Sequence, residues 1–210
     1  MTDSQGQPSD PGVLPPNPTP EPEGSRPGGP VQPGPMGLVY GDVVSRVIAI
    51  IIDGILIGIV SGILEVFAGL VFGPAIRLAT DGSIAGDVNY LTVLAGAVIG
   101  IAVSFAYFFL LWTTQRATLG MRVLGLQVGN ETDGATITSN QSAIRWAALF
   151  GPAALSQAFW PVPVVGPLIG LVSFVWVLAL LVTTAQSPTK QGLHDRYAHT
   201  MVVRAVRRVA

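Results

Sequence analysis

Four apolar stretches occupy most of the chain after its first 40 residues, and they constrain the fold more than any other feature. They run over about residues 43–72, 90–112, 143–160 and 164–184. A helix needs about 20 mostly apolar residues to cross a bilayer. Since 50 % of the 210 residues are hydrophobic and only 11 % are charged, we expect an all-α, polytopic membrane protein in contact with a lipid bilayer.

The third stretch is the shortest and contains Gly151 and Pro152, so it fits a kinked span, a tilted span or a re-entrant segment. The basic residues favour four spans over three, because they accumulate on the cytoplasmic side of short loops. With four spans, Arg77 is the only one of the 11 Lys and Arg residues that does not fall on the cytoplasmic side. We therefore predict four transmembrane helices with both termini in the cytoplasm.

Residues 1–37 form a Pro/Gly-rich tail that contains 11 of the 17 prolines and few large apolar side chains. Such a segment cannot bury enough apolar surface to offset the entropy of ordering. We expect this tail to be disordered and residues 38–210 to form the transmembrane domain. The tail is either a solvated tether or a docking segment for a protein partner with an aromatic-lined groove.

The segment between the second and third stretches has the pattern of a small cytoplasmic β-hairpin. Residues 122–128 and 135–138 are strand-like arms, and the turn-rich residues 130–134 separate them. A lone two-stranded hairpin is marginally stable. Residues 199–204, after the fourth stretch, would add a third strand on the same face.

Glycines recur at every fourth position of the first stretch, at Gly54, Gly58 and Gly62. Small residues at this spacing let two helix backbones approach closely. We expect them to pack the first span against the second. A homodimer seam is the alternative.

Asp53 lies inside the apolar run of the first span, where a carboxylate costs roughly 2.5 to 3.5 kcal/mol on translocon scales and therefore needs partners or a purpose. Arg46 shares its helical face, but seven residues rise about 10.5 Å and helical side chains lean toward the N-terminus. A direct bridge between the two is therefore unfavourable, and a partner from another segment is expected for each.

Other ionisable residues can reach the same interface. Asp195 follows the fourth span beside the titratable His194, and Arg145 lies at the start of the third span. We predict a buried polar cluster of Arg46, Asp53, Arg145 and Asp195 with His194 as a neighbour. Such a cluster either fixes helix register or, through Asp53, exchanges a proton and a cation. Glu65, near the outer end of the first span, is a further candidate.

Three segments together resemble the RDD family of membrane proteins: Arg46–Asp53, Thr118–Val128, and Gln191–Arg196 with Thr200–Val203. The family is named for one arginine and two aspartates, and the resemblance implies that these are Arg46, Asp53 and Asp195. The Pro-rich tail is similar to that of actinobacterial RDD proteins of the proline-rich-antigen type, which implies a bacterial cell membrane. Met121 stands where a basic residue is expected, which lowers the charge of the linker.

The resemblance implies a molecular function that is undetermined, with transport of an unidentified ligand suggested and sodium/proton exchange proposed for some members. Two hypotheses follow. Either the protein moves a small ion or solute as a homodimer, with Asp53 as the protonatable site, or it is a non-transporting scaffold or accessory subunit that recruits partners through its tail.

Other classes of function lack their signatures. The sequence has no nucleophile elbow and no phosphate-binding glycine loop, and its two histidines, His194 and His199, do not form a metal motif. A net charge of −1 argues against nucleic-acid binding. We therefore expect no enzymatic activity, no metal and no cofactor.

Overall fold

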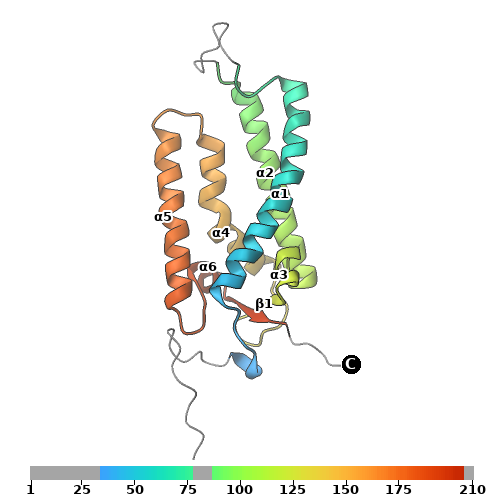
Figure 1. Cartoon of the computed structure of the whole chain (residues 1–210), viewed down its shortest axis with the longest axis vertical. Helices are drawn as coiled ribbons and strands as arrows, with labels where there is room; N and C mark the ends of the chain where they lie inside the picture. Colours follow the sequence, from blue (N-terminus) through green and yellow to red (C-terminus); the bar gives the residue numbers. More distant parts are fainter. Residues whose placement is uncertain (1–33, 78–86, 206–210) are drawn as a thin grey trace, which may run out of the picture. The chain divides into compact units, whose positions relative to one another are not determined.

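The computed structural model describes residues 34–77 and 87–205, and Figure 1 shows its long helices with the short elements gathered at one end. We call this end the base. In chain order the elements are η1 (Pro35–Gly37), α1 (Val43–Phe72), α2 (Tyr90–Gln115), α3 (Leu119–Val123), β1 (Leu126–Asn130), α4 (Ser139–Phe159), α5 (Val165–Gln186), α6 (Leu193–Tyr197) and β2 (Thr200–Arg204).

A long helix occupies each of the four apolar stretches, and side-chain caps mark where α1, α2 and α4 begin. Asp42 caps α1 by accepting the backbone N–H of Ser45 at 3.0 Å. Thr138 and Gln141 form a capping box, so α4 begins at Ser139 rather than near residue 143. Each cap satisfies backbone N–H groups that the first turn leaves without partners.

Three of these helices, α1, α2 and α5, are long and apolar enough to cross a membrane. Helix α4 has 21 residues but contains Pro152 and several polar side chains. The outward faces of the three apolar helices carry large exposed hydrophobic side chains, such as Leu70, Val98 and Val172. Such extended apolar surfaces match a lipid environment.

The long helices pack in the order α1, α2, α4 and α5, and α1 and α5 make few direct contacts with each other. Trp146 of α4 donates its indole N–H to Ser104 of α2 at 3.1 Å, and Trp176 of α5 donates to the carbonyl of Ala148 in α4 at 2.7 Å. These bonds join neighbouring helices in that order.

A two-stranded antiparallel sheet lies at the base, with Val128 of β1 opposite Val202 of β2. The segment before α1 joins the other edge of β2 through a bridge between Tyr40 and Val203. Residues 199–204 were expected to supply a third strand. The structure instead pairs β2, from this segment, directly with β1. The expected partner, residues 135–138, has no strand conformation, although Asn130 still donates its N–H to Ala135 O at 2.9 Å.

The main buried apolar cluster also lies at the base, where α1, α2, α3 and the sheet meet. Its members are Ala49, Phe108, Trp112, Ala117, Met121, Leu126, Val128, Ile137 and Val202. Burial of these apolar side chains holds the short elements at the base against the long helices.

The glycines of α1 do not make the close helix contact that their spacing suggested. A Cβ built on Gly54, Gly58 or Gly62 meets no atom within 4 Å among the described residues. All three line a cavity between α1, α2 and α4 instead. The helices α1 and α2 do pack together, but through other residues.

One further expectation concerns a segment that the structure leaves largely undescribed. Residues 1–33 of the Pro-rich tail lie outside the described residues, and its last residues include the turn η1. The loop between α1 and α2 is likewise described only up to residue 77 and from residue 87.

Candidate functional site

Asp53 is buried and accepts three hydrogen bonds that fasten α2 and the α3 segment to α1. The donors are the Tyr107 hydroxyl at 2.6 Å, the Thr118 hydroxyl at 2.5 Å and the Gly120 backbone N–H at 2.8 Å. The carboxylate is 1 % exposed. We call these four residues the Asp53 cluster.

The two hydroxyls of this cluster are oriented by backbone groups of α3. The Tyr107 oxygen accepts the N–H of Leu119 at 3.1 Å, and the Thr118 oxygen accepts the N–H of Met121 at 3.2 Å. With an N–H donated to each oxygen, both hydroxyl protons point to Asp53. All three neighbours therefore donate to the carboxyl group of Asp53.

A second group of buried charges surrounds Asp195 on α6. Arg46 of α1 contacts Asp195 Oδ2 at 2.8 Å, and Arg145 of α4 donates to Oδ1 of the same carboxylate. The His194 Nε2 atom lies 3.5 Å from Oδ2. We call Arg46, Arg145, His194 and Asp195 the Asp195 cluster.

The two arginines of the Asp195 cluster also bind the segments around it. Arg46 donates to the carbonyls of Gly41 and Val202, both at 3.2 Å. Arg145 donates to the Thr200 hydroxyl at 2.7 Å and stacks over the Trp112 ring, 5.1 Å from its centroid. The cluster thus joins α1, α4, α6 and β2 at one point.

The net pKa shift is downward for both α6 residues of this cluster, His194 and Asp195. Burial alone raises the pKa of Asp195, but Arg145, His194 and Arg46 outweigh it and hold that pKa well below its usual range. Burial lowers the pKa of His194 to about 4, and the two arginines add to this effect against Asp195. Near neutral pH the cluster therefore contains an ionised aspartate and a neutral histidine.

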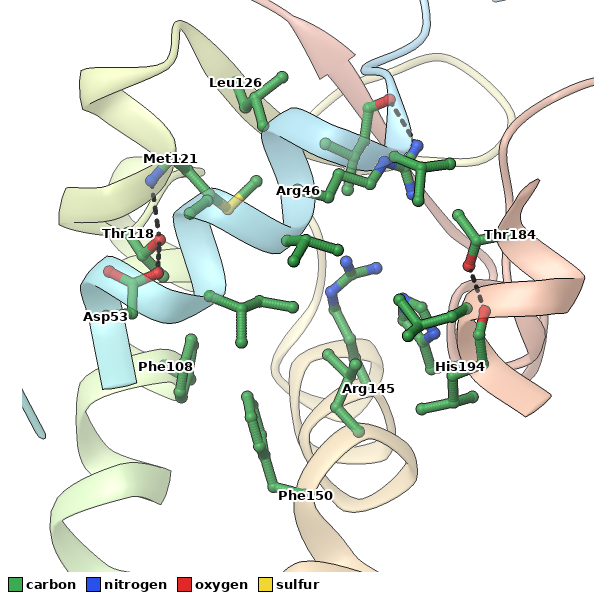
Figure 2. A pocket seen from close by; sticks show the side chains of 18 of the residues that line it. Arg46, Asp53, Phe108, Thr118, Met121, Leu126, Arg145, Phe150, Thr184 and His194 are labelled. Carbon is green, nitrogen blue, oxygen red and sulfur yellow. Dashed lines mark hydrogen bonds between the residues drawn. The ribbon is translucent and has the colours of Figure 1, made fainter. Parts of the chain in front are cut away.

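The structure separates Asp53 from the cluster that the sequence predicted around it. The structure brings together Arg46, Arg145, His194 and Asp195. Among the described residues, no cation forms an ion pair with Asp53. The partners of Asp53 come from α2 and the α3 segment. Figure 2 shows Asp53 and Thr118 on one side of a cavity and Arg145 and His194 on the other.

This base cavity has a volume of about 200 Å³ and lies between α1, α2, α4 and α5. A middle cavity of about 420 Å³ shares Phe108, Phe150 and Ala153 with it. A far cavity of about 240 Å³ shares Glu65 and Gln157 with the middle one. The three cavities therefore follow one another along the bundle.

Glu65, the other acidic candidate, lies where the middle and far cavities meet. Its carboxyl carbon is 3.6 Å from the position that a Cβ on Gly96 of α2 would take. Within the described ranges it forms no ion pair within 4.0 Å. It is separate from both clusters at the base.

Sequence reasoning did not identify Tyr107, Thr118 and Gly120 as partners of Asp53. The sequence did contain a local signal for Thr118, because threonine is a favoured N-cap residue and Thr118 directly precedes α3. Gly120 is required by space, since a Cβ there would lie 2.2 Å from the Ala49 carbonyl oxygen. Tyr107 stands among phenylalanines, and no local pattern distinguishes it.

The apolar helices and the buried charges at one end of the bundle define a helical membrane protein whose polar network ties its N-terminal, central and C-terminal segments together. The chain belongs to the RDD family, whose family model matches residues 40–199. Neither the curated proteins nor the solved structures contain a match to this chain.

Proposed function

We propose that this RDD protein moves a small ion or solute along the row of three cavities, and that it has no enzymatic activity. The row is the observation that carries the proposal. Its lining on α1 runs from Val43 in the base cavity to Gly69 in the far one. At 1.5 Å per residue this is about 39 Å, longer than the roughly 30 Å hydrocarbon core of a bilayer.

The pairing within the sheet supports four membrane crossings. Strand β1 lies between α2 and α4, and β2 follows α5, yet the two strands pair directly. Paired strands lie on the same side of a membrane. An even number of crossings therefore separates them, so α4 crosses if α5 does. The basic residues make this side the cytoplasmic one.

The two carboxylates of α1 take different parts in this proposal. The donors around Asp53 give it a fixed structural role, anchoring α3 beside the base cavity. Glu65 lies in the row itself and has no ion-pair partner among the described residues, so it is the better protonatable site.

The experiment uses the full chain in liposomes that enclose a pH-sensitive dye, with a sodium or potassium gradient imposed across the membrane. We expect a pH change that depends on the protein and is lost in Glu65→Gln. Asp53→Asn distinguishes the anchoring role of Asp53 from the protonatable role of Glu65. Replacing the carboxylate acceptor by an amide should loosen α3 as well as lower flux. The protection of Leu119–Val123 amides from hydrogen exchange reports that loosening.

Obstruction of the row provides a matched control. Ala153 lines the base and middle cavities, so Ala153→Phe should block flux. Ala147 is an exposed alanine of the same helix outside the three cavity linings, so Ala147→Phe should leave flux intact. Equal flux in both variants, or none in the wild type, would refute transport along the row.

The alternative is a scaffold in which the polar clusters only order the base. The number of segments joined at Asp195 favours it, because such a junction holds α6 and β2 against α1 and α4 as one rigid face. A scaffold of this kind predicts no flux in the wild type and capture of a protein partner that depends on residues 1–37.

A further inference from the structure

The base cavity combines apolar walls with polar groups at one end. Side chains such as Phe108, Leu149 and Leu180 form most of its lining, and Arg46, Arg145 and His194 lie at the α6 end. A volume of about 200 Å³ exceeds the 150 Å³ of a protein cavity that is known to bind benzene. The base cavity therefore has room for a small organic group.

Two buried donors that line this cavity have no acceptor among the described residues. They are Arg145 Nε and Trp112 Nε1; His194 Nδ1, whose role depends on its tautomer, also has no partner among these residues. Arg145 is 4 % exposed and Trp112 is 2 % exposed. Both groups can only donate, and buried donors are nearly always paired in folded proteins. A ligand that accepts hydrogen bonds would satisfy both.

The charges at this end favour a negative ligand. Arg46 and Arg145 share the single carboxylate of Asp195, and His194 is neutral near neutral pH because its pKa is about 4. Asp53 also lines the cavity, but its oxygens accept bonds from the α3 side. Near Asp195, two guanidinium groups therefore ion-pair with one carboxylate, and Asp42 adds a weaker attraction to Arg46.

The cavity reaches the lipid-facing surface between α1 and α5, the helices that make few contacts with each other. Ile50 of α1 and Val177 and Leu181 of α5 line it there, and they are 41 %, 45 % and 38 % exposed. A ligand at the two donors can extend an apolar chain past these residues.

We propose that the base cavity binds an amphiphile with one anionic head, a carboxylate or a phosphate, whose apolar chain leaves between α1 and α5. The head accepts hydrogen bonds from Arg145 Nε and Trp112 Nε1. The site goes beyond the proposed transport, because it binds its ligand whether or not that ligand is moved.

Octanoate is the probe, titrated calorimetrically into the full chain in phosphatidylcholine nanodiscs, with empty nanodiscs subtracted. Octanol has a similar chain without the charge. We expect octanoate to bind at least about tenfold more tightly than octanol, since a hydrogen bond to a charged group contributes that much or more. Equal affinities, or no binding of octanoate, would overturn the proposal.

Two tryptophan substitutions on α5 locate the site. Leu181 lines the cavity and Leu178 does not, although they are 38 % and 45 % exposed on the same helix. Leu181→Trp should weaken octanoate binding by about tenfold or more, and Leu178→Trp should leave it unchanged. Trp112→Phe keeps most of the ring volume and removes one donor, so it should weaken binding several-fold without loss of folding. Equal binding in both α5 variants would place octanoate elsewhere and overturn the proposal.

The source of the head group is identified by competition. Phosphatidic acid added to the nanodisc should displace octanoate if the natural ligand is a bilayer lipid. Octanoate binding that persists beside phosphatidic acid identifies a free carboxylate, and both results uphold the anionic site. Because the titration measures no flux, a failed transport assay with intact octanoate binding refutes transport alone.

Discussion

At the scale of single residues, Asp53 and Asp195 perform different tasks. Asp53 accepts hydrogen bonds from neutral groups, whereas Asp195 forms ion pairs with two guanidinium groups. Removal of one partner from a buried charge group leaves the other charge uncompensated, which typically costs about 3–5 kcal/mol. Protonation of Asp195 would therefore leave Arg46 and Arg145 without their shared carboxylate.

The first prediction concerns the pH dependence of stability. The pKa of His194 falls from 6.5 to about 4 on folding, so the unfolded chain binds more protons in this window. The free energy of unfolding should therefore decrease as the pH falls from about 6.5 to about 4. Asp195, whose folded pKa is also lowered, adds a further loss below the ordinary aspartate pKa of about 4.

The two histidines provide a matched pair for this measurement. Denaturant titrations in detergent at several pH values should show a smaller slope between pH 6.5 and 4 in His194→Gln. His199 is the exposed histidine, with 77 % of its side chain accessible, so His199→Gln should retain the slope. A slope that survives in His194→Gln would contradict this assignment.

At the scale of elements, Gly120 and Gly54 have opposite surroundings: a Cβ would clash at Gly120 and would meet open space at Gly54. Gly120 brings α3 against the backbone of α1, where a Cβ would lie 2.2 Å from the Ala49 carbonyl oxygen. Gly54 is in the interior of α1 beside open space. A glycine in a helix interior costs roughly 0.5–1 kcal/mol relative to alanine, because it has more conformational freedom to lose.

Gly120→Ala should lower the free energy of unfolding by about 1–3 kcal/mol, because the extra methyl group displaces α3 from a packed contact. Gly54→Ala should raise it by up to about 1 kcal/mol. Unfolding of both variants in the same detergent gives the two values, and hydrogen exchange of Leu119–Val123 should accelerate only in Gly120→Ala. Equal effects of the two substitutions would contradict the close contact at Gly120.

The sequence predicted the long helices better than it predicted their contacts. Apolar runs and capping residues are local signals, and α1 begins and ends where they indicate. The partner of β1 was missed because pairing with β2 joins segments about 70 residues apart, which no local turn reveals. The partners of Asp53 were missed for the same reason. Arg46 and Asp195 were brought into one group because both flank apolar spans.

At the scale of the whole membrane domain, the sheet and the Asp195 cluster limit the topology. The segment before α1, the segment between α2 and α4, and the segment after α5 all meet at the base. The chain must therefore cross the bilayer an even number of times between any two of these segments. Helix α4, with Pro152 and Arg145, is less apolar than its neighbours. In the proposed four-span topology, its packing between α2 and α5 would let it cross with less apolar surface, since neighbouring helices can shield its polar groups.

Cysteine labelling tests this topology directly, because the natural chain has no cysteine. Val164, in the α4–α5 turn, is 71 % exposed, and His199 is exposed before β2. In intact cells a membrane-impermeant thiol reagent should label Val164→Cys and spare His199→Cys until the membrane is opened. If α4 did not cross, the pattern would reverse, because α5 alone would then carry the C-terminal segment outside. Such a reversal would also separate β1 from β2 across the bilayer, so it would contradict the sheet pairing as well as the four-span topology.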